Sequence, residues 1–171
     1  MHHLPLADVN PEAIERLLDR AFGPDRRART AYKVRGQARA IPELSFASVE
    51  NGALLGTVQC WPIRLAGDDG SVHPLVMVGP VAVEPARQGT GVGRALVARA
   101  MDAARETGRD AALMLIGDPE YYERFGFAAD RTGAWRLPGP VERRRLLACG
   151  HSVPDLPGML GPALDDVTDA A

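Results

Sequence analysis

Hydrophobic residues near the start of the chain recur at the spacing of one side of an amphipathic helix. Asn10-Pro11 precedes them and offers an N-cap followed by a proline at the first helical position. Phe22-Gly-Pro ends the pattern. We expect a short strand over residues 4–9, this helix after it, and a second helix over residues 25–39. The apolar stripe of the first helix consists of Ile14, Leu17, Leu18 and Ala21.

Two apolar segments flank Asn51-Gly52, a pair of residues that favours the tight turn of a β-hairpin. Residues 44–50 and 53–64 are therefore predicted to be its two strands. A further apolar run over residues 75–83 shows no alternation with polar residues, which indicates a strand that is buried on both faces.

Gly79-Pro80 interrupts this apolar strand. Proline has no N–H to donate to a neighbouring strand, and Gly-Pro inside a strand is typical of a bulge or a local loss of pairing. We therefore expect the strand to separate from one neighbour here, leaving the backbone groups of Val81 and Val83 free to pair with something else.

The second half of the chain alternates helical and extended patterns. A helix is predicted from Val92, and residues 111–116 follow as a buried strand, so that strand, helix and strand form a right-handed parallel crossover. Asp118-Pro119 starts a short helix by the same cap-and-proline logic. The last predicted strands are residues 133–137 and 143–148.

No internal repeat is visible, and no linker divides the chain. Residues 1–150 are expected to form a single domain. Residues 151–171 are expected to be an irregular tail, packed on the domain or trailing from it, because closely spaced prolines and glycines are followed there by acids.

A glycine-rich segment, Gln88-Gly-Thr-Gly-Val-Gly93, lies between the apolar strand and the helix that follows it. Its glycines remove Cβ atoms where a ligand must approach the backbone, and they leave N–H groups free at the start of a helix. These donors and the positive end of the helix dipole favour a phosphate. The spacing matches neither a P-loop nor the GxGxxG fingerprint of dinucleotide sites. The alternative is a glycine-rich turn without a ligand.

This order of elements resembles the acyl-CoA-binding motif of the GCN5-related N-acetyltransferases (GNAT). Val81-Ala-Val83 is followed by Gln88-x-x-Gly-x-Gly93 and a helix, and Tyr122-Glu-Arg-Phe-Gly-Phe127 matches the YxxxGF segment that the family carries after the next strand. The resemblance covers about residues 4–148 by element order. Within the superfamily, residues 117–127 are most similar to the YhbS-like branch of acetyltransferases.

The resemblance implies a mixed α/β fold whose mostly antiparallel central sheet has about six to seven strands, with flanking helices and with residues 75–83 splayed from residues 111–116. It also implies acetyl-CoA as cosubstrate and no metal. The splayed strand accepts the pantetheine arm, a backbone N–H near Val81 polarises the thioester carbonyl, and the glycine loop holds the pyrophosphate. The implied binding residues are Val81, Ala82, Val83, Gln88, Gly89, Thr90, Gly91, Val92, Gly93 and Arg94.

By the same resemblance, Tyr122 is the catalytic acid that protonates the departing thiolate of CoA. A phenol with a pKa of about 10 is protonated at neutral pH, so it can act as an acid without special tuning. The alternative is that Tyr122 only packs against the cofactor arm. Tyr121 is one residue off the motif and is expected in the core or at the rim of the site.

No general base can be carried over from the family. Some members have a glutamate on the splayed strand before the bulge, where this chain has Val76, Met77 and Val78. Asp118 is expected to be occupied as the cap of its helix. The other groups considered for this role, none of them well placed, are Glu50, His73, Glu84 and Glu120.

Composition and charge fit an ordinary globular enzyme: the chain has 171 residues, of which 46% are hydrophobic. A net charge of −2 argues against a nucleic-acid partner. No apolar stretch is long enough for a membrane span and no signal peptide is visible, so we expect a cytoplasmic protein without a membrane partner. Cys60 and Cys149 are isolated, which implies neither a disulfide framework nor a zinc cluster. A monomer and a homodimer are both compatible with the sequence.

Basic residues within residues 25–39 bear on the acceptor. In the family, the segment after the first helix commonly forms a wall of the acceptor site. Arginines there suggest an anionic acceptor, such as a carboxylate, a phosphorylated metabolite or an acidic carrier protein. The alternative is a solvated helix face. The basic residues of this segment are Arg26, Arg27, Arg29, Lys33, Arg35 and Arg39, of which Arg26, Arg27 and Arg29 are singled out as the ones to substitute.

Three functions stay open. The first is an acetyl-CoA-dependent N-acetyltransferase whose acceptor is an amine of a small molecule or protein that attacks the thioester directly. The second is a longer-chain acyltransferase using acyl-CoA or an acyl carrier protein, for which Gly79, Ala82 and Gly117 leave room. The third is a non-catalytic acyl-CoA sensor, which the missing base favours and the intact tyrosine motif opposes.

Overall fold

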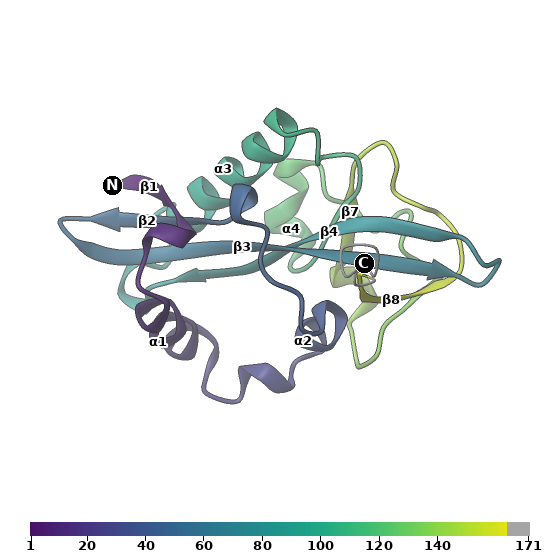
Figure 1. Ribbon diagram of the computed structural model, residues 1–171, viewed down its shortest axis with the longest axis horizontal. Helices are drawn as coiled ribbons and strands as arrows, with labels where there is room; N and C mark the ends of the chain where they lie inside the picture. The colour runs from purple at the N-terminus through teal and green to yellow at the C-terminus, as the bar shows by residue number, and fades with distance from the viewer. Residues whose placement is uncertain (164–171) are drawn as a thin grey trace, which may run out of the picture.

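The structure, a computed structural model, describes residues 1–163, which are built around an eight-stranded sheet (Figure 1). Across the sheet the strands follow the order β1 (His2–Pro5), β2 (Phe46–Glu50), β3 (Ala53–Gly67), β4 (Val72–Val83), β5 (Leu113–Ile116) and β7 (Leu146–Cys149). The remaining strands are β6 (Trp135–Arg136) and β8 (Gly158–Pro162). β8 pairs with β3 and β6. Paired strands run antiparallel except for β4 with β5 and β6 with β8.

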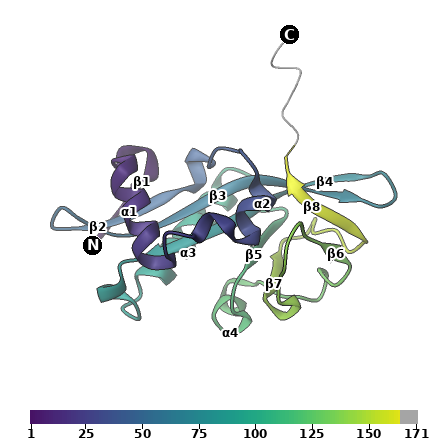
Figure 2. The same cartoon turned by 90° about the horizontal axis from the view of Figure 1, so that it is seen from below.

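The two faces of the sheet are covered by α1 (Pro11–Phe22), α2 (Thr30–Arg35), α3 (Val92–Glu106) and α4 (Pro119–Tyr122). α1 and α2 lie on one face, and α3 lies on the other (Figure 1 and Figure 2). α3 packs on Phe46 and Val58, whereas α1 packs on Ala47 and Ala82 from the opposite side of the same strands. The sheet therefore divides the core into two layers.

Most of the predicted elements are confirmed. The Asn10 side chain caps α1 and accepts a hydrogen bond from the backbone N–H of Glu12 at 2.9 Å. Asn51 and Gly52 take positive φ in the turn between β2 and β3, as the hairpin requires. The apolar stripe of α3, which consists of Val92, Leu96, Ala100 and Ala104, is buried. The mixed, mostly antiparallel fold class is confirmed, with eight strands within residues 1–163 where six or seven were expected.

Two N-terminal elements are shorter than predicted. The strand expected over residues 4–9 ends at Pro5, because Leu6 turns inward to join the core layer of α1 and a 3-10 turn follows. The helix expected over residues 25–39 is reduced to α2 and a preceding 3-10 turn (Arg26–Ala28). Gly36 ends α2 with a φ of 58°, which glycine adopts readily.

The prediction that residues 75–83 are buried on both faces was wrong in part. Val76, Val81 and Val83 are only partly buried, and the last two lie where β4 has no pairing with β5. Leu75, Met77, Val78 and Ala82 are buried as expected.

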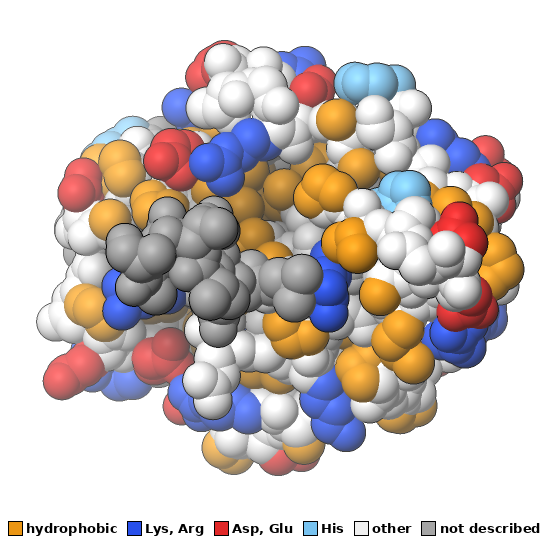
Figure 3. Space-filling model, turned by 45° about the vertical axis from the view of Figure 1, so that its right-hand side comes forward, with side chains coloured by type: hydrophobic (Ala, Val, Ile, Leu, Met, Phe, Trp, Pro, Cys, Tyr) orange, Lys and Arg blue, Asp and Glu red, His pale blue; other side chains and the backbone are white. Residues whose placement is uncertain are grey.

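The prediction of an irregular tail after residue 150 was wrong for β8. β2 covers only the first part of β3, and β8 pairs with the open edge at residues 63–67. Leu160 is fully buried while Met159 is exposed, as in a strand with one buried face. Hydrophobic side chains on this side of the molecule are interspersed with charged ones (Figure 3). Residues 164–171, the end of the expected tail, lie outside the described residues.

Gly56 on β3 sets the distance between the sheet and α3. A Cβ atom there would lie 2.8 Å from the carbonyl oxygen of Ala82 and 2.9 Å from a methyl group of Leu96. Gly56→Ala should therefore lower the free energy of unfolding by about 1–3 kcal/mol through overpacking, as measured by urea denaturation. Gly161→Ala on β8 is the matched control, because a Cβ would meet nothing within 4 Å there. Equal losses in the two variants would contradict this account.

Candidate active site

β4 and β5 separate in the middle of the sheet. Val76 and Met77 pair with β5, and beyond them no strand within residues 1–163 lies against this edge of β4. The register between β3 and β4 shifts at the same point, so that Gly79 and Pro80 together oppose the single residue Gln59. Gly79-Pro80 therefore forms the bulge that the sequence predicts.

Val81 and Val83 turn their backbone groups into the opening. The N–H of Glu84 donates to the carbonyl oxygen of Leu55 on β3 at 2.8 Å. Since backbone groups alternate in direction along a strand, those of Ala82 also point toward β3, and those of Val81 and Val83 point to the edge that β5 leaves. The side chain of Ala82 is buried against α1, so this expected binding residue is not brought to the opening.

A tryptophan from β3 holds the bulge. Nε1 of Trp61 donates a hydrogen bond of 2.7 Å to the carbonyl oxygen of Gly79. The Trp61 ring itself packs in the buried layer with Leu75 and Met77. A buried side-chain donor therefore satisfies a carbonyl that the interrupted ladder does not pair, which fixes the position of β4 at the splay.

The glycine loop reaches the same opening. Gly89 and Gly91 have φ angles of 80° and 92°, a region that other residues rarely adopt. Gly91 is the N-cap of α3 and, unlike Asn10 at α1, it provides no side-chain cap. The N–H groups of the first turn are therefore available to a ligand. Gly93 in this turn lies close to β4, since a Cβ there would be 3.3 Å from a methyl group of Val83.

The splayed strands and the glycine loop line a cleft of about 1350 Å³. Its wall includes the end of α1 and α2 on one side of the sheet and the start of α3 and α4 on the other. All the expected binding residues line it except Ala82 and Thr90. The Thr90 hydroxyl instead donates to the backbone carbonyl of Arg87. An unpaired strand edge and an uncapped helix start on one cleft can hold an extended, phosphorylated ligand.

The two tyrosines of α4 line the cleft in different surroundings. Tyr122 is packed over Gly117, where a side chain would collide with its ring. Burial, and then the neighbouring Tyr121 and Asp118, raise the pKa of Tyr122 to about 12. Tyr121 lies beside the glycine loop, with its hydroxyl oxygen 3.5 Å from the position of a Cβ on Gly93. Tyr121 therefore belongs to the rim of the cleft and not to the core.

Within residues 1–163, the carboxylates that line the cleft are those of Asp118 and Glu142. Contrary to expectation, the Asp118 side chain does not cap α4; it accepts a hydrogen bond from Nε of Arg145 at 3.2 Å. Glu142 belongs to no motif and was missed by sequence reasoning. Its loop is tied to α2 because the Thr30 hydroxyl donates to the carbonyl oxygen of Pro140 at 2.7 Å. No local signal in the sequence indicates this contact.

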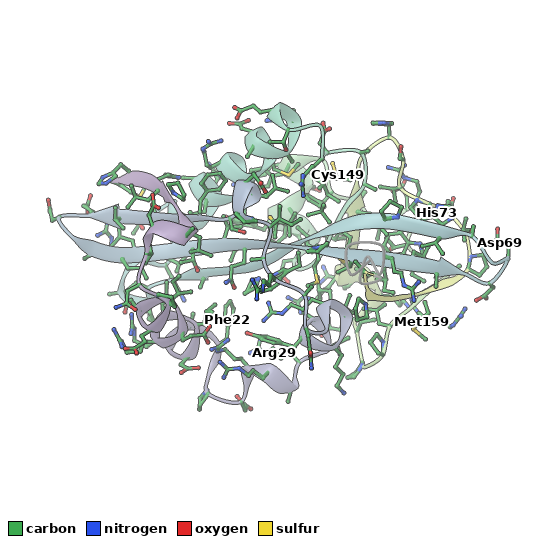
Figure 4. The ribbon with its side chains drawn as sticks, in the orientation of Figure 1. Phe22, Arg29, Asp69, His73, Cys149 and Met159 are labelled. Atoms are coloured by element: carbon green, nitrogen blue, oxygen red, sulfur yellow. The ribbon has the colours of Figure 1, made fainter. Side chains whose placement is uncertain are left out.

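The other groups considered as a base lie elsewhere. Glu50, Glu84 and Glu120 each form an ion pair with an arginine, and none of them lines the cleft. His73 lies with Asp69 toward the tip of the hairpin between β3 and β4, far from the glycine loop (Figure 4). These residues are therefore not brought together with Tyr122.

Arg26 is engaged inside the protein. Its side chain is 2% exposed and donates to Asp19 at 2.9 Å, to the Tyr32 hydroxyl at 2.6 Å and to Glu15. Burial acts to lower the pKa of Arg26, but these partners outweigh it and raise the pKa. Arg27 pairs with Glu15 at 2.7 Å on the surface. Both arginines therefore already have carboxylate partners from α1, and Arg27 does not line the cleft, so neither offers an unpaired charge to an acceptor.

Arg29 lies at the mouth of the cleft, where its guanidinium covers the ring of Phe22 at 5.4 Å from the ring centre (Figure 4). The guanidinium also donates to the carbonyl oxygen of Phe22 at 3.2 Å. Of the three arginines singled out from the sequence, Arg29 is the one left exposed at the cleft without an acidic partner among residues 1–163.

Three further features of the described part of the chain bear on its function. None of its helices has the length and apolar character to cross a membrane. It contains no group of three or more His, Cys, Asp or Glu side chains arranged to hold a metal ion. Cys60 is buried, and burial raises the pKa of its thiol to about 12.

Comparisons with known proteins agree with this geometry. Residues 5–129 match the model of the acetyltransferase (GNAT) domain family. The chain is 33% identical over 133 residues to the uncharacterized N-acetyltransferase YhbS of Escherichia coli (strain K12), covering 77% of each chain. The crystal structure of Escherichia coli YhbS in complex with CoA superposes with a TM-score of 0.68 at 25% identity, over 89% of this chain and 83% of that one. A GNAT family acetyltransferase from Brucella melitensis in complex with acetyl-CoA gives 0.55 at 25% identity, over 86% and 94%.

The contacts of Arg26 generate a prediction about stability. Arg26→Met removes the donor for Asp19 and the Tyr32 hydroxyl, so the free energy of unfolding should fall by about 1–3 kcal/mol in urea denaturation. Arg27→Gln is the matched control: the Arg27 side chain is 62% exposed, and loss of its surface ion pair should cost less than about 1 kcal/mol. A loss for Arg26→Met no larger than for the control would show that Arg26 is not a structural residue.

Proposed function

The chain belongs to the GNAT acetyltransferase family, and from this premise we propose that it transfers the acetyl group of acetyl-CoA to an amine by direct attack of the amine on the thioester. One observation carries the proposal: the unpaired edge of β4 and the uncapped start of α3 face the same cleft. The relatives that were crystallised with CoA or acetyl-CoA support this choice of cosubstrate.

The chain's own backbone would do most of the binding. Val81 and Val83 would pair with the amides of the pantetheine arm as they would with an added strand. The N–H groups of Val92, Gly93 and Arg94, in the first turn of α3, would hold the pyrophosphate. Acetyl-CoA supplies an activated acyl group, since its thioester carbonyl is open to attack by a neutral amine. A donor N–H on β4 near Val81 would stabilise the charge that develops on the carbonyl oxygen.

Proton balance assigns a role to Tyr122. A bond forms between the amine nitrogen and the acetyl carbon, the carbon–sulfur bond breaks, the amine loses one proton and the thiolate gains one. The raised pKa of Tyr122 keeps its hydroxyl protonated at neutral pH, so the proton is present when charge develops on sulfur. The raised pKa also makes the phenol a weaker acid, but burial raises the basicity of a thiolate beside it in the same direction, so the two shifts oppose each other in the proton transfer.

The proton that the amine loses needs an acceptor. Asp118 and Glu142 line the cleft, and Asp118 is already bound to Arg145. Glu142 has no ion pair within residues 1–163 and is exposed, so a water in the cleft would be able to connect it to the amine. The proposal therefore assigns proton removal to water and Glu142 rather than to a glutamate on β4, where the chain has none.

Gly93→Glu tests the assignment of the glycine loop. The new side chain would stand at the first turn of α3 with a charge of the same sign as a phosphate, so acetyl-CoA affinity should fall by at least about 100-fold in calorimetric titration. Gly93 is the sharper site than Gly91, because the φ of 92° at Gly91 would strain any side chain. Gly133→Glu is the control, since Gly133 has open space around it and does not line the cleft. Unchanged acetyl-CoA affinity in a folded Gly93→Glu protein would contradict the assignment of the glycine loop as the pyrophosphate site.

Tyr122→Phe tests proton donation. The substitution keeps the ring packed over Gly117 but removes the hydroxyl, so kcat should fall by about 100- to 10,000-fold while acetyl-CoA affinity changes little. Tyr121→Phe is the matched control at the rim and should leave kcat within about threefold of the parent. Steady-state and single-turnover kinetics of CoA release would measure both. A Tyr122→Phe enzyme as fast as the control, under conditions where chemistry limits the rate, would show that the thiolate leaves without help from Tyr122.

A further inference from the structure

Arg35 is a buried arginine of the cleft that has no anionic partner among residues 1–163. Its side chain is 9% exposed and it lines the cleft from the last turn of α2. No carboxylate of residues 1–163 lies within ion-pair distance of it, and Glu15, the nearby acid, is already bound to Arg26 and Arg27. A buried charge without a counter-charge is costly, so proteins rarely retain one that has no use.

Two aromatic rings hold the Arg35 guanidinium in place. Its central carbon lies 3.8 Å from the centre of the Tyr32 ring and 3.8 Å from the centre of the Trp61 ring. Contacts of a guanidinium with aromatic faces are favourable, and more so away from water. Burial lowers the pKa of Arg35, yet an arginine stays protonated at neutral pH. Because rings lie against its faces, the guanidinium can bind a further partner only through the N–H groups at its edge.

The same rings tie Arg35 to the splay. Trp61 donates to the carbonyl oxygen of Gly79 in the bulge, which places Arg35 one ring away from the point where β4 leaves β5. The hydroxyl of Tyr32 accepts a hydrogen bond from Arg26, which α1 holds. The charge of Arg35 is therefore positioned from both ends, beside the place where the thioester carbonyl is proposed to lie.

We infer that Arg35 binds a carboxylate of the acyl acceptor, so that the acceptor is an amine that carries a carboxylate nearby, as a free amino acid does. This inference rests on the proposed function and names its substrate class. The edge of a guanidinium matches the two oxygens of a carboxylate, and its single charge balances a single negative charge. A phosphate monoester brings about 1.5 to 2 negative charges. The other arginines that line the cleft from the side of α1 and α2 are engaged, since Arg26 binds Glu15 and Asp19 and Arg29 is turned onto Phe22.

The test compares acceptors that differ only in the carboxylate. A panel of amino acids, each paired with its C-terminal amide and with its decarboxylated amine, is assayed for CoA release from acetyl-CoA, alongside phosphorylated amines. The parent enzyme should prefer the carboxylate member of each reactive pair. Arg35→Gln should raise the KM for that member by about 10- to 100-fold, leave the KM for its amide unchanged, and leave acetyl-CoA affinity unchanged. Arg35→Lys keeps the charge but not the planar fork and should fall between the two.

Arg27→Gln is the matched control, because Arg27 is exposed, does not line the cleft and should leave every KM unchanged. A second readout is independent of turnover: calorimetric titration of the CoA-saturated parent with the same amino acids should show binding that Arg35→Gln loses. A parent enzyme that neither binds nor acetylates carboxylate-bearing amines overturns the inference, as does an equal rise of KM for acids and amides, or a preference for phosphorylated amines. If the parent protein does not bind acetyl-CoA in calorimetry, both the proposed function and this inference are overturned.

Discussion

The loss of pairing between β4 and β5 after Met77 is the constraint on which the rest of the site depends. Strands inside a sheet normally pair on both edges, because unpaired backbone groups away from water are costly. Here two residues of β4 oppose one of β3 at the bulge, and the indole N–H of Trp61 donates a hydrogen bond to the carbonyl oxygen of Gly79. The free edge then faces a cleft in which a ligand can make the missing hydrogen bonds. The cost of opening the sheet is thus offset when a strand-like ligand is bound.

The small residues near the splay have packing reasons of their own. Gly117 makes room for the ring of Tyr122, and Ala82 is covered by α1 on the far side of the sheet. Gly79 takes a φ of 126° at the bulge, which a residue with a side chain rarely adopts. Ala82 does not line the cleft, and the ring of Tyr122 already takes the space over Gly117, so of the three residues only Gly79 leaves room in the cleft. The long-chain acyltransferase therefore keeps little of the support that it had from the sequence, while the position of Tyr122 on the cleft opposes a non-catalytic sensor.

What the sequence predicts well is encoded within a few neighbouring residues. The bulge at Gly79-Pro80, the uncapped start of α3 and the cap at Asn10 all follow from backbone chemistry that needs no distant partner. Contacts across the chain were not predictable in this way. Glu142 reaches the cleft through a hydrogen bond between Thr30 and Pro140, which are 110 residues apart, and β8 forms because β3 is longer than its partner β2. Neither fact leaves a local pattern.

The arginine-rich segment shows why a row of equal charges in a sequence cannot be assigned a single role. Arg26 and Arg35 lie in the same short stretch and both are buried, but among residues 1–163 Arg26 has carboxylates from α1 and Arg35 has aromatic rings and no carboxylate. Within these residues the fold supplies a counter-charge to one guanidinium and not to the other, which is the one proposed to bind a ligand in the cleft. Arg26 also supports Arg35, because removing Arg26 would release the Tyr32 ring that packs against the Arg35 guanidinium.

These contacts form a connected series from α1 to the splay, which runs through Asp19, Arg26, Tyr32, Arg35, Trp61 and Gly79. Through this series, the layer of α1 and α2, which carries no cofactor-binding motif, fixes the geometry of β4, where the thioester is proposed to lie.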